Sequence, residues 1–333
     1  MSFIEEIKNR AKQEIKTIVL PEATDIRILK AAQIVNKEKY AKVVLIGNTE
    51  EIEKLIKENG LELGETQIID PVKSEETSEY AKELYELRKA KGMTEEQAQK
   101  LILEPIYYGM MMVKQNDADG LVSGAAHSTA DTLRPALQIL KTAPGTKLVS
   151  AFFVMVVPNC EYGANGTFIF ADSGLNEEPD ADKLSEIAIS SSKSFKQLVG
   201  EEPKVAMLSY STYGSAHSAS TEKVVEATRL AKEKAPELLI DGELQLDAAI
   251  IPEVAEFKAK GSPLKGQANV LVFPDLGAGN IGYKLTQRLA KAEAYGPLCQ
   301  GIARPVNDLS RGCSSEDVAG VVAITAVQAQ SQG

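Results

Sequence analysis

Four side chains that could do chemistry lie within eight positions near the C-terminal end of the sequence. Ser310, Arg311, Cys313 and Asp317 supply a hydroxyl, a guanidinium, a thiol and a carboxylate. A glycine between them permits a tight bend, and an apolar helical run follows. Free backbone N–H groups and the helix dipole attract negative charge at a helix start, so arginine beside serine there favours a phosphate or another small anion. We call residues 307–317 the signature loop and interpret it as a candidate anion site.

Two of these side chains allow a second interpretation. Cys313 could be a nucleophile whose pKa falls near a helix start, but no histidine lies beside it, which favours a small residue in a tight turn. Asp317 follows Ser314 by three positions, which is the spacing of a capping box. The spacing alone does not separate a capping carboxylate from a catalytic base.

Two other loops place small residues and hydroxyls directly after an expected strand. They are residues 123–134 and 209–218. Ligands bind outside the carboxyl ends of parallel strands, and both loops begin at such an end. The first loop is equally compatible with a plain capped helix, with Ser128 or Thr129 as the N-cap. The second is as often a simple connection as a site, and His217 within it is interpreted as a cap or surface residue.

A glycine pattern later in the chain matches a dinucleotide motif. Residues 277–282 fit G-x-G-x-x-G after an expected strand. The acidic residue expected about 20 positions further on is missing, because Ile302 and Arg304 occupy that region. An arginine could serve a 2′-phosphate, so NADP stays open, but we favour close packing between a strand and a helix.

The composition is that of a globular protein without a nucleic-acid or membrane partner. The formal net charge is −10 and no basic patch stands out, which argues against nucleic acid. No apolar run approaches the ~18 residues that span a membrane, and no signal segment is visible, so we expect a cytoplasmic protein. The three cysteines are widely spaced and there are two histidines, so we expect neither a disulfide frame nor a metal.

Short apolar runs alternate with helical patterns along most of the 333 residues. The length favours two domains, and the alternation predicts an α/β protein with mainly parallel sheets. Two apolar stretches, 148–157 and 167–171, are joined by a turn and indicate an antiparallel hairpin. We expect further strands at 17–20, 43–47, 68–70, 119–125, 204–208, 238–241, 269–273 and 297–303, and helices at 26–37, 50–58, within 76–115, at 131–141, 182–199, 220–234, near 246–260, at 280–294 and at 316–330.

Several motifs, in one order over the whole length, carry a resemblance to a known family. Together with the signature loop they make the chain similar to the bacterial and archaeal phosphate acetyltransferases, or phosphotransacetylases. The stretches that carry the resemblance are IVLPE at 18–22, VSGAAHS at 122–128, DTLRP at 131–135, FADSG at 170–174, MLSYST at 207–212, DGELQ at 241–245, FPDL at 273–276 and NDLSRG at 307–312.

The resemblance implies a fold and an assembly. The family is similar in fold to isocitrate and isopropylmalate dehydrogenases, with two α/β domains flanking a cleft, usually in a dimer. It implies domain I from residues 1–145 plus 297–333, and domain II from 146–296. The C-terminal segment would then complete the first domain. We expect the site in the cleft between the two domains, and we expect a homodimer. The family pattern near 277–282 needs only Gly279, which counts further against a dinucleotide site.

The resemblance also implies a reaction. The family transfers an acetyl group between acetyl phosphate and coenzyme A, with phosphate as the third small-molecule substrate or product. By position, Arg311 would bind the phosphate and stabilise transition-state charge, Asp317 would take the thiol proton, and Ser310 would donate a hydrogen bond to the reacting carbonyl. A thiol of pKa ~8.5 is mostly protonated at neutral pH, so such a base would help.

Substrate contacts follow from the same resemblance. Arg88 and Arg134 would contact the anionic coenzyme. Family members often carry a run of serines in the loop after His127, whereas Ser128 is followed here by Thr129 and an alanine, so one further hydroxyl is kept. Ser128 and Thr129 would then also contact a substrate or the coenzyme. We expect coenzyme A or acetyl-CoA as a substrate, no tightly bound cofactor and no metal, since a guanidinium supplies the positive charge.

We therefore predict direct attack of the thiolate on acetyl phosphate in a ternary complex, without an acetyl-enzyme. The nearest alternative is a phosphate butyryltransferase, which differs in the acyl pocket. A metal- and NAD(P)-dependent decarboxylating dehydrogenase of similar fold would need a cluster of metal-binding aspartates. A catalytically silent binding module is disfavoured by the presence of Ser310, Arg311 and Asp317 together.

Overall fold

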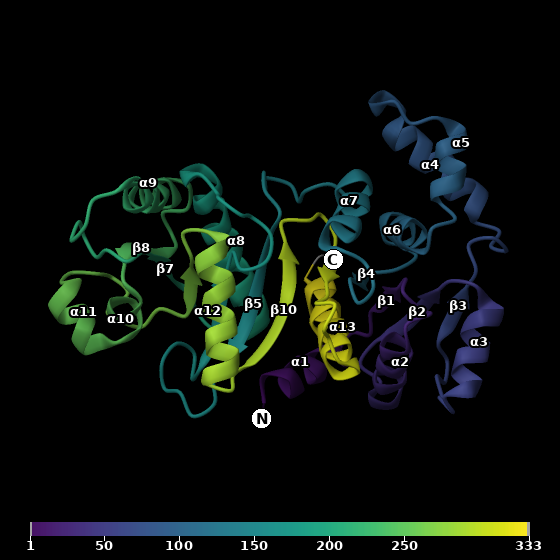
Figure 1. Ribbon diagram of the computed structural model, residues 1–333, viewed down its shortest axis with the longest axis horizontal. Coiled ribbons are helices and arrows are strands. Elements are labelled where there is room, and N and C mark those ends of the chain that lie inside the picture. Colours follow the sequence, from purple (N-terminus) through teal and green to yellow (C-terminus); the bar gives the residue numbers. More distant parts are fainter. Residues whose placement is uncertain (1, 332–333) are drawn as a thin grey trace. The chain divides into compact units, whose positions relative to one another are not determined.

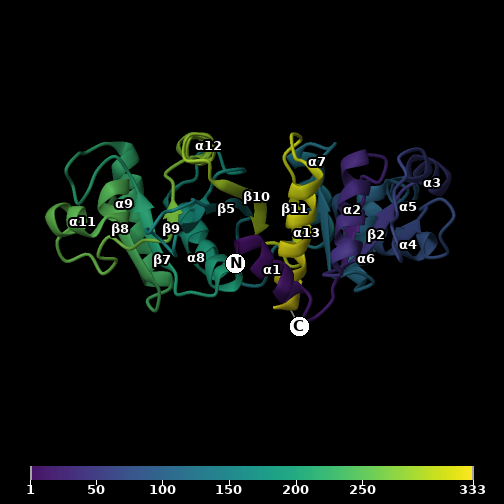
Figure 2. The ribbon, with the colours of Figure 1, turned by 90° about the horizontal axis from the view of Figure 1, so that it is seen from below.

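The computed structural model describes residues 2–331. The chain divides into two compact units, Met1–Pro144 with Ile302–Gly333, and Gly145–Gly301. Each unit contains its own β-sheet, and Figures 1 and 2 label the elements. Among the described residues, no helix is both long and apolar enough to cross a membrane.

The sheet of the first unit has five strands, all parallel. Their order is β11-β4-β1-β2-β3, so β1 lies at the centre. The last strand in the sequence therefore pairs with β4 at one edge. The strands are β1 (Thr17–Leu20), β2 (Lys42–Ile46), β3 (Gln67–Ile69), β4 (Gly120–Ser123) and β11 (Val306–Asp308).

Helices cover both faces of this sheet. Helix α13 contacts β1, β4 and β11 and lies beside α1 and α2, whereas α6 contacts β2 and β4, and α7 contacts β11. Helix α4 packs on α5, α6 and α7. The helices of the unit are α1 (Phe3–Ala11), α2 (Ile26–Glu38), α3 (Thr49–Glu58), α4 (Thr77–Arg88), the 3-10 turn η1 (Lys89–Lys91), α5 (Glu95–Leu101), α6 (Pro105–Gln115), α7 (Thr129–Ile139) and α13 (Ser315–Gln330).

The two covered faces explain why β1 is apolar at successive positions. Neighbouring residues of a strand point to opposite faces, and Val19 lies close to Gly109 of α6. Ile18 lies close to Gly120, which also faces Thr325 of α13. Both faces are therefore core, as in most parallel sheets. Helix α13 is buried along almost its whole length, in keeping with its apolar sequence.

The second unit has a mixed six-stranded sheet in the order β10-β5-β6-β9-β7-β8. Strands β5 and β6 pair antiparallel, which confirms the predicted hairpin, and β6, β9, β7 and β8 are parallel neighbours. Helix α8 contacts β6, β7, β9 and β10, while α12 contacts β5, β6 and β10. The elements are β5 (Ser150–Val156), β6 (Thr167–Ala171), α8 (Ala181–Val199), β7 (Lys204–Leu208), α9 (Ala219–Lys234), β8 (Leu239–Leu244), α10 (Leu246–Ile250), α11 (Pro252–Lys258), β9 (Val270–Val272), α12 (Leu276–Leu289) and β10 (Glu293–Gln300).

The end of the second unit differs from the expected pattern. The helix expected to end at residue 294 ends at Leu289, and the strand expected at 297–303 is β10, which starts at Glu293 and pairs antiparallel with β5. The predicted domain boundary at 296/297 therefore falls inside a strand. Strand β11 was not predicted. The glycine motif lies within α12, where Gly279 packs against the Asp172 backbone, so close packing accounts for it.

Candidate active site

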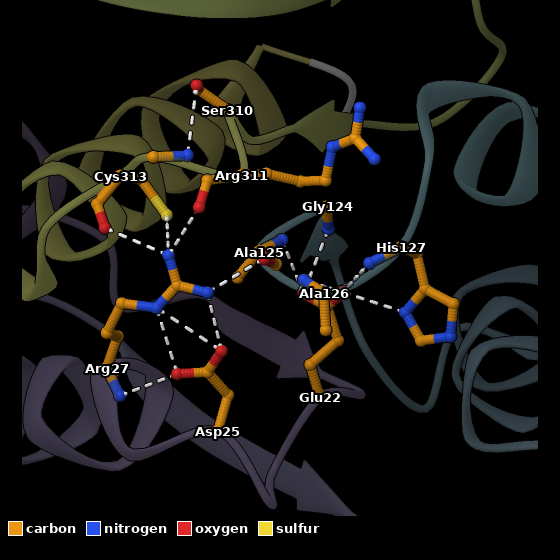
Figure 3. Close-up of polar contacts among 11 residues, drawn as sticks. Glu22, Asp25, Arg27, Gly124, Ala125, Ala126, His127, Ser310, Arg311 and Cys313 are labelled. Carbon is orange, nitrogen blue, oxygen red and sulfur yellow. Dashed lines mark hydrogen bonds and ion pairs between the residues drawn. The ribbon is translucent and has the colours of Figure 1, made fainter.

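The functional candidates of the first unit gather where three neighbouring parallel strands end. Strand β1 leads to β2 and β3 on one side, and the chain then returns to β4 on the other side. In open α/β sheets, ligands bind outside the carboxyl ends of the strands at such a reversal of direction. Three segments follow these ends, namely residues 21–25, residues 124–128 and the signature loop (Figure 3).

The carboxylate of Glu22 fills the nest of N–H groups that follows β4. Its two oxygens accept hydrogen bonds from the backbone N–H groups of Gly124, Ala125, Ala126 and His127 at 2.8–2.9 Å. The side chain is 1% exposed. Successive amides of this kind form an anion site, and here the protein's own carboxylate occupies it. These four amides are therefore not available to a substrate phosphate.

Glu22 also orients the imidazole of His127. The ring Nδ1 lies 2.7 Å from Glu22 Oε1, which already accepts two backbone bonds and so acts as an acceptor toward the ring. Nδ1 therefore carries the proton, and Nε2 is left for another partner. The imidazole is 42% exposed, in contrast to the buried carboxylate that holds it.

Arg27 joins the three segments. Its guanidinium pairs with Asp25 at 2.6 Å and donates to the carbonyl oxygen of Ala125 at 2.8 Å. It also donates to the carbonyl oxygens of Arg311 at 2.7 Å and Cys313 at 3.2 Å (Figure 3). The planar fork of a guanidinium can serve several acceptors at fixed angles, which a lysine cannot do. The signature loop is thus tied to the loop after β4 by one side chain.

The hydroxyls of Ser128 and Thr129, in the loop after β4, both donate hydrogen bonds to carboxylates of the protein. Ser128 is the N-cap of α7, accepting from the N–H of Asp131 and donating to its carboxylate at 2.6 Å. The plain capped helix is therefore present. The Thr129 hydroxyl donates to Oδ2 of Asp308 at 2.6 Å, which makes a second tie between the two loops.

Asp308 is a buried carboxyl at the end of β11. It is 1% exposed, and burial raises its pKa to about 6, while the hydrogen bond from Thr129 acts in the opposite direction. Gly124 adopts a φ of +115°, and a Cβ there would collide with Asp308 and Leu309. Only glycine therefore allows the two loops to pack this closely.

The signature loop leaves its central arginine free. Ser310 Oγ accepts from the N–H of Gly312 at 3.3 Å, and both Ser310 and Arg311 are exposed. Within residues 2–331, the Arg311 guanidinium makes no hydrogen bond or ion pair, and Figure 3 shows it extending away from the Arg27 network. An exposed guanidinium beside a hydroxyl, on a loop whose backbone is fixed, is suited to binding an anion such as phosphate.

Asp317 forms the capping box that its spacing predicts. Ser314 accepts from the N–H of Asp317 at 3.1 Å, and Asp317 Oδ2 accepts from the N–H of Ser314 at 2.9 Å. The side chain is exposed, so the cap does not remove the carboxylate from solvent. Its Oδ2 is engaged by the helix start, which fixes the direction in which Oδ1 points.

Cys313 does not have the environment of a nucleophile. It is 7% exposed, and burial raises the pKa of its thiol to about 11, with Arg27 as a weaker opposing influence. Reactive cysteines are thiolates of lowered pKa, whereas a buried thiol is inert. The structure thus favours the small residue in a tight turn.

The two predicted coenzyme arginines lie near one tyrosine. Burial raises the pKa of Tyr107, and the charges of Arg134 and Arg88 both act against this rise. Arg88 Nε is buried without a hydrogen-bond partner, and its side chain lines a pocket of about 500 Å³ that also includes Lys91 and Lys100. Within the described residues, no hydrogen bond or ion pair links this group to the signature loop.

Sequence reasoning missed the side chains that fix the loops. Glu22 lies inside one of the family motifs and Asp308 inside the signature loop, but the sequence alone indicates no role for either, and Arg27 falls within an expected helix. Their partners are about 100 to 280 positions away in the sequence. The position of Glu22, directly after Leu20 and Pro21 at the end of a buried strand, is the one signal that could have indicated its role. A carboxylate buried there must accept hydrogen bonds from N–H or O–H donors.

No metal centre is visible in the part of the chain that the structure describes. Within residues 2–331, no three histidine, cysteine, aspartate or glutamate side chains are grouped so that they could hold an ion.

The comparisons with known proteins agree with these features. The family model described as phosphate acetyl/butaryl transferase matches residues 2–326. The phosphate acetyltransferase of Acetivibrio thermocellus is 69% identical, covering 99% of both chains, and that of Thermoanaerobacterium thermosaccharolyticum is 58% identical, covering 99% of this chain and 100% of the relative. A solved phosphotransacetylase from Streptococcus pyogenes is 42% identical with a TM-score of 0.93, covering 99% of this chain and 100% of that one. The chain therefore belongs to the phosphate acetyl/butaryl transferase family.

Proposed function

We propose that this protein is a phosphate acetyltransferase, which catalyses acetyl-CoA + phosphate = coenzyme A + acetyl phosphate. One structural observation carries the proposal, namely the exposed and unpaired guanidinium of Arg311 between Ser310 and the helix start that presents Asp317. The relatives at 69% and 58% identity bear this activity in their names. No cofactor beyond the substrates is needed.

The reaction proceeds by direct attack of the coenzyme thiolate on acetyl phosphate in a ternary complex. Arg311 binds the phosphate through its planar fork, and Ser310 donates to the carbonyl oxygen as negative charge develops there. Asp317 takes the thiol proton. The neutral, buried thiol of Cys313 supports the absence of an acetyl-enzyme.

Arg88 and Arg134 bind the anionic coenzyme. Their charges converge near Tyr107, and the pocket beside Arg88 adds two lysines. Ser128 and Thr129 support substrate binding by holding the loop after β4 in position, because both hydroxyls already donate to carboxylates of the protein. We further propose that the protein acts in the cytoplasm as a homodimer in which domain I ends with the C-terminal segment.

The acyl group is acetyl rather than butyryl. The family model spans both activities, whereas the relatives of highest identity reported above are acetyltransferases. Turnover of acetyl phosphate should exceed that of butyryl phosphate at equal concentration. A dehydrogenase is not favoured, since a solved dehydrogenase-like structure is 12% identical with a TM-score of 0.53, which shows the fold alone.

A thioester assay with acetyl phosphate and coenzyme A tests the site. Arg311→Gln should lose about 10²–10³-fold and Asp317→Asn about 10²–10⁴-fold in kcat. Asn keeps an oxygen that can accept from Ser314, so the helix cap and the melting temperature should change little. Arg229→Gln, on an exposed arginine of α9, is the matched control. Wild-type turnover in both site variants would remove the residue assignment even if the reaction is right.

A further inference from the structure

The proposed acyl transfer needs a proton donor that the roles above do not include. When the acyl carbon–oxygen bond of dianionic acetyl phosphate breaks, the electron pair stays on oxygen, and the departing group would be a phosphate trianion. That trianion is strongly basic and leaves poorly, whereas the product of the balanced reaction is hydrogen phosphate. A side chain that donates a proton to the departing oxygen therefore lowers the activation free energy of carbon–oxygen bond cleavage, as general acids do.

His127 has the geometry of such a donor. Glu22, 1% exposed and fixed by four backbone N–H groups, accepts from Nδ1 at 2.7 Å. This bond sets both the ring orientation and the tautomer, as the carboxylate does in other carboxylate–histidine pairs. The opposite nitrogen, Nε2, belongs to a ring that is 42% exposed, so it is open to a ligand.

The His127 ring and Arg311, which we assign to phosphate binding, lie on neighbouring loops at the carboxyl ends of β4 and β11. The loop that carries it is joined to the signature loop on both sides of His127. On one side Arg27 donates to the carbonyl oxygens of both Ala125 and Arg311 (Figure 3). On the other side Thr129 donates to Asp308. The two loops therefore keep a fixed relation, as a catalytic pair requires.

The other ionisable groups of these loops are poorly suited to the task. Cys313 is buried with a pKa of about 11, and Asp308 is 1% exposed. The Arg27 side chain holds the pKa of Asp25 below its ordinary value. Arg311 does not release a proton in proteins. Histidine is the side chain that exchanges a proton near neutral pH, and His127 is the one histidine in these segments.

We propose that His127, oriented by Glu22, is the general acid that protonates the departing phosphate. In its acid form the ring is an imidazolium, with one proton on Nδ1 bonded to Glu22 and a second on Nε2. The thiolate sulfur forms its bond to the acetyl carbon, the carbon–oxygen bond breaks, and its electron pair on oxygen takes the Nε2 proton, which gives hydrogen phosphate and leaves the ring neutral with its proton on Nδ1. Asp317 holds the thiol proton and exchanges it with solvent, from which His127 is protonated again. In the reverse direction the same Nε2 removes the proton from attacking hydrogen phosphate. The inference rests on the proposed function of the site.

The first test compares two leaving groups in the wild type and His127→Gln. Acetyl phosphate needs the general acid, because its leaving group would otherwise be the strongly basic phosphate trianion. Acetyl methyl phosphate instead releases the methyl phosphate dianion, whose conjugate acid has a pKa of about 6, so this leaving group departs without being protonated. We expect kcat of His127→Gln to fall about 10²–10⁴-fold with acetyl phosphate, and within about tenfold with the methyl ester. His217→Gln, an exposed histidine of the other unit, is the control. Equal losses with both donors, or no loss, overturn the inference.

A second test does not depend on a variant that folds. The chain has two histidines, so ¹⁵N-histidine NMR of the wild type resolves each ring, and His217→Gln assigns them. The neutral His127 ring should carry its proton on Nδ1, and phosphate should shift its Nε2 signal but not that of His217. A proton on Nε2 in the neutral ring, or no response to phosphate, contradicts the proposal. A wild type without thioester activity would instead refute the proposed function itself.

Discussion

Replacing Arg27 should loosen the signature loop without removing any group that we assign to a substrate. In Arg27→Gln, the carbonyl oxygens of Ala125, Arg311 and Cys313 lose donors at 2.8, 2.7 and 3.2 Å, and Asp25 loses its ion pair. A hydrogen bond from a charged donor contributes about 1.5–3 kcal/mol. The side chain is 29% exposed, so water replaces part of this, and we expect a net cost of about 2–4 kcal/mol.

The functional effect should exceed the effect on stability. A displacement of catalytic groups by about 1 Å costs up to 10²-fold in rate, so kcat for acetyl phosphate and coenzyme A should fall about 10- to 100-fold in Arg27→Gln. Arg27→Lys should be intermediate, because an ammonium cannot serve Ala125 and Arg311 in one plane. The assays are steady-state kinetics and urea unfolding on the same preparations.

The matched control is Arg229→Gln. Arg229 pairs with both Glu226 and Glu233 on α9, but it is 52% exposed. Exposed pairs contribute about 0–1 kcal/mol, so neither stability nor kcat should change measurably. A kcat of Arg27→Gln equal to that of the wild type, or an equal response of both variants, would refute the view that the Arg27 network holds the catalytic loop in place.

Two further predictions concern buried groups. Burial raises the pKa of Asp308 from 3.8 to about 6, so the folded state holds this proton more tightly than the unfolded state. As pH rises from about 4 to about 6, the free energy of unfolding of the wild type should therefore fall by about 2–3 kcal/mol relative to that of Asp308→Asn. Urea unfolding of both proteins at pH 4 and pH 7.5 measures this change, and a difference between the two proteins that does not vary with pH would disprove it. Cys313→Ala should keep at least about a tenth of the wild-type kcat, since the thiol is neutral near pH 7; complete loss, or an acetyl adduct on Cys313 by mass spectrometry, would argue against direct attack.

The sequence predicted the fold wherever apolar runs were long or helices carried caps. The central strand at Thr17–Leu20, the N-cap at Ser128 and the hairpin of β5 and β6 are all present. Strand β11 has only three residues, two of them polar, so no hydrophobic pattern marks it. Strand β10 is half-exposed over its first residues and contains Gly296-Pro297, which reads as a loop. In both cases pairing with a neighbouring strand, rather than local preference, creates the element.

In the candidate site, too, the residues that local sequence could indicate differ from those that only distant contacts define. The signature loop could be recognised because its reactive residues are adjacent in sequence and precede a helix. Glu22, Arg27 and Asp308 could not be assigned, because their roles depend on partners that only the assembled sheet brings near. The resemblance indicated which residues react, whereas the structure indicates which residues hold them.

Asp317 shows why the capping and catalytic interpretations need not exclude each other. Its Oδ2 accepts from the Ser314 N–H at 2.9 Å, while the side chain remains exposed. A carboxylate held by one oxygen at a helix start has few rotamers left, so the other oxygen faces a fixed direction. A base must be within hydrogen-bond reach of its proton, and this restriction is an advantage. Ser314→Ala removes the hydroxyl that accepts from the Asp317 N–H but keeps the backbone N–H that holds Oδ2, so stability should fall by about 1 kcal/mol while kcat stays within about tenfold of the wild type. A loss of kcat in Ser314→Ala as large as that in Asp317→Asn would contradict this view, because the backbone N–H alone would then not hold the base in position.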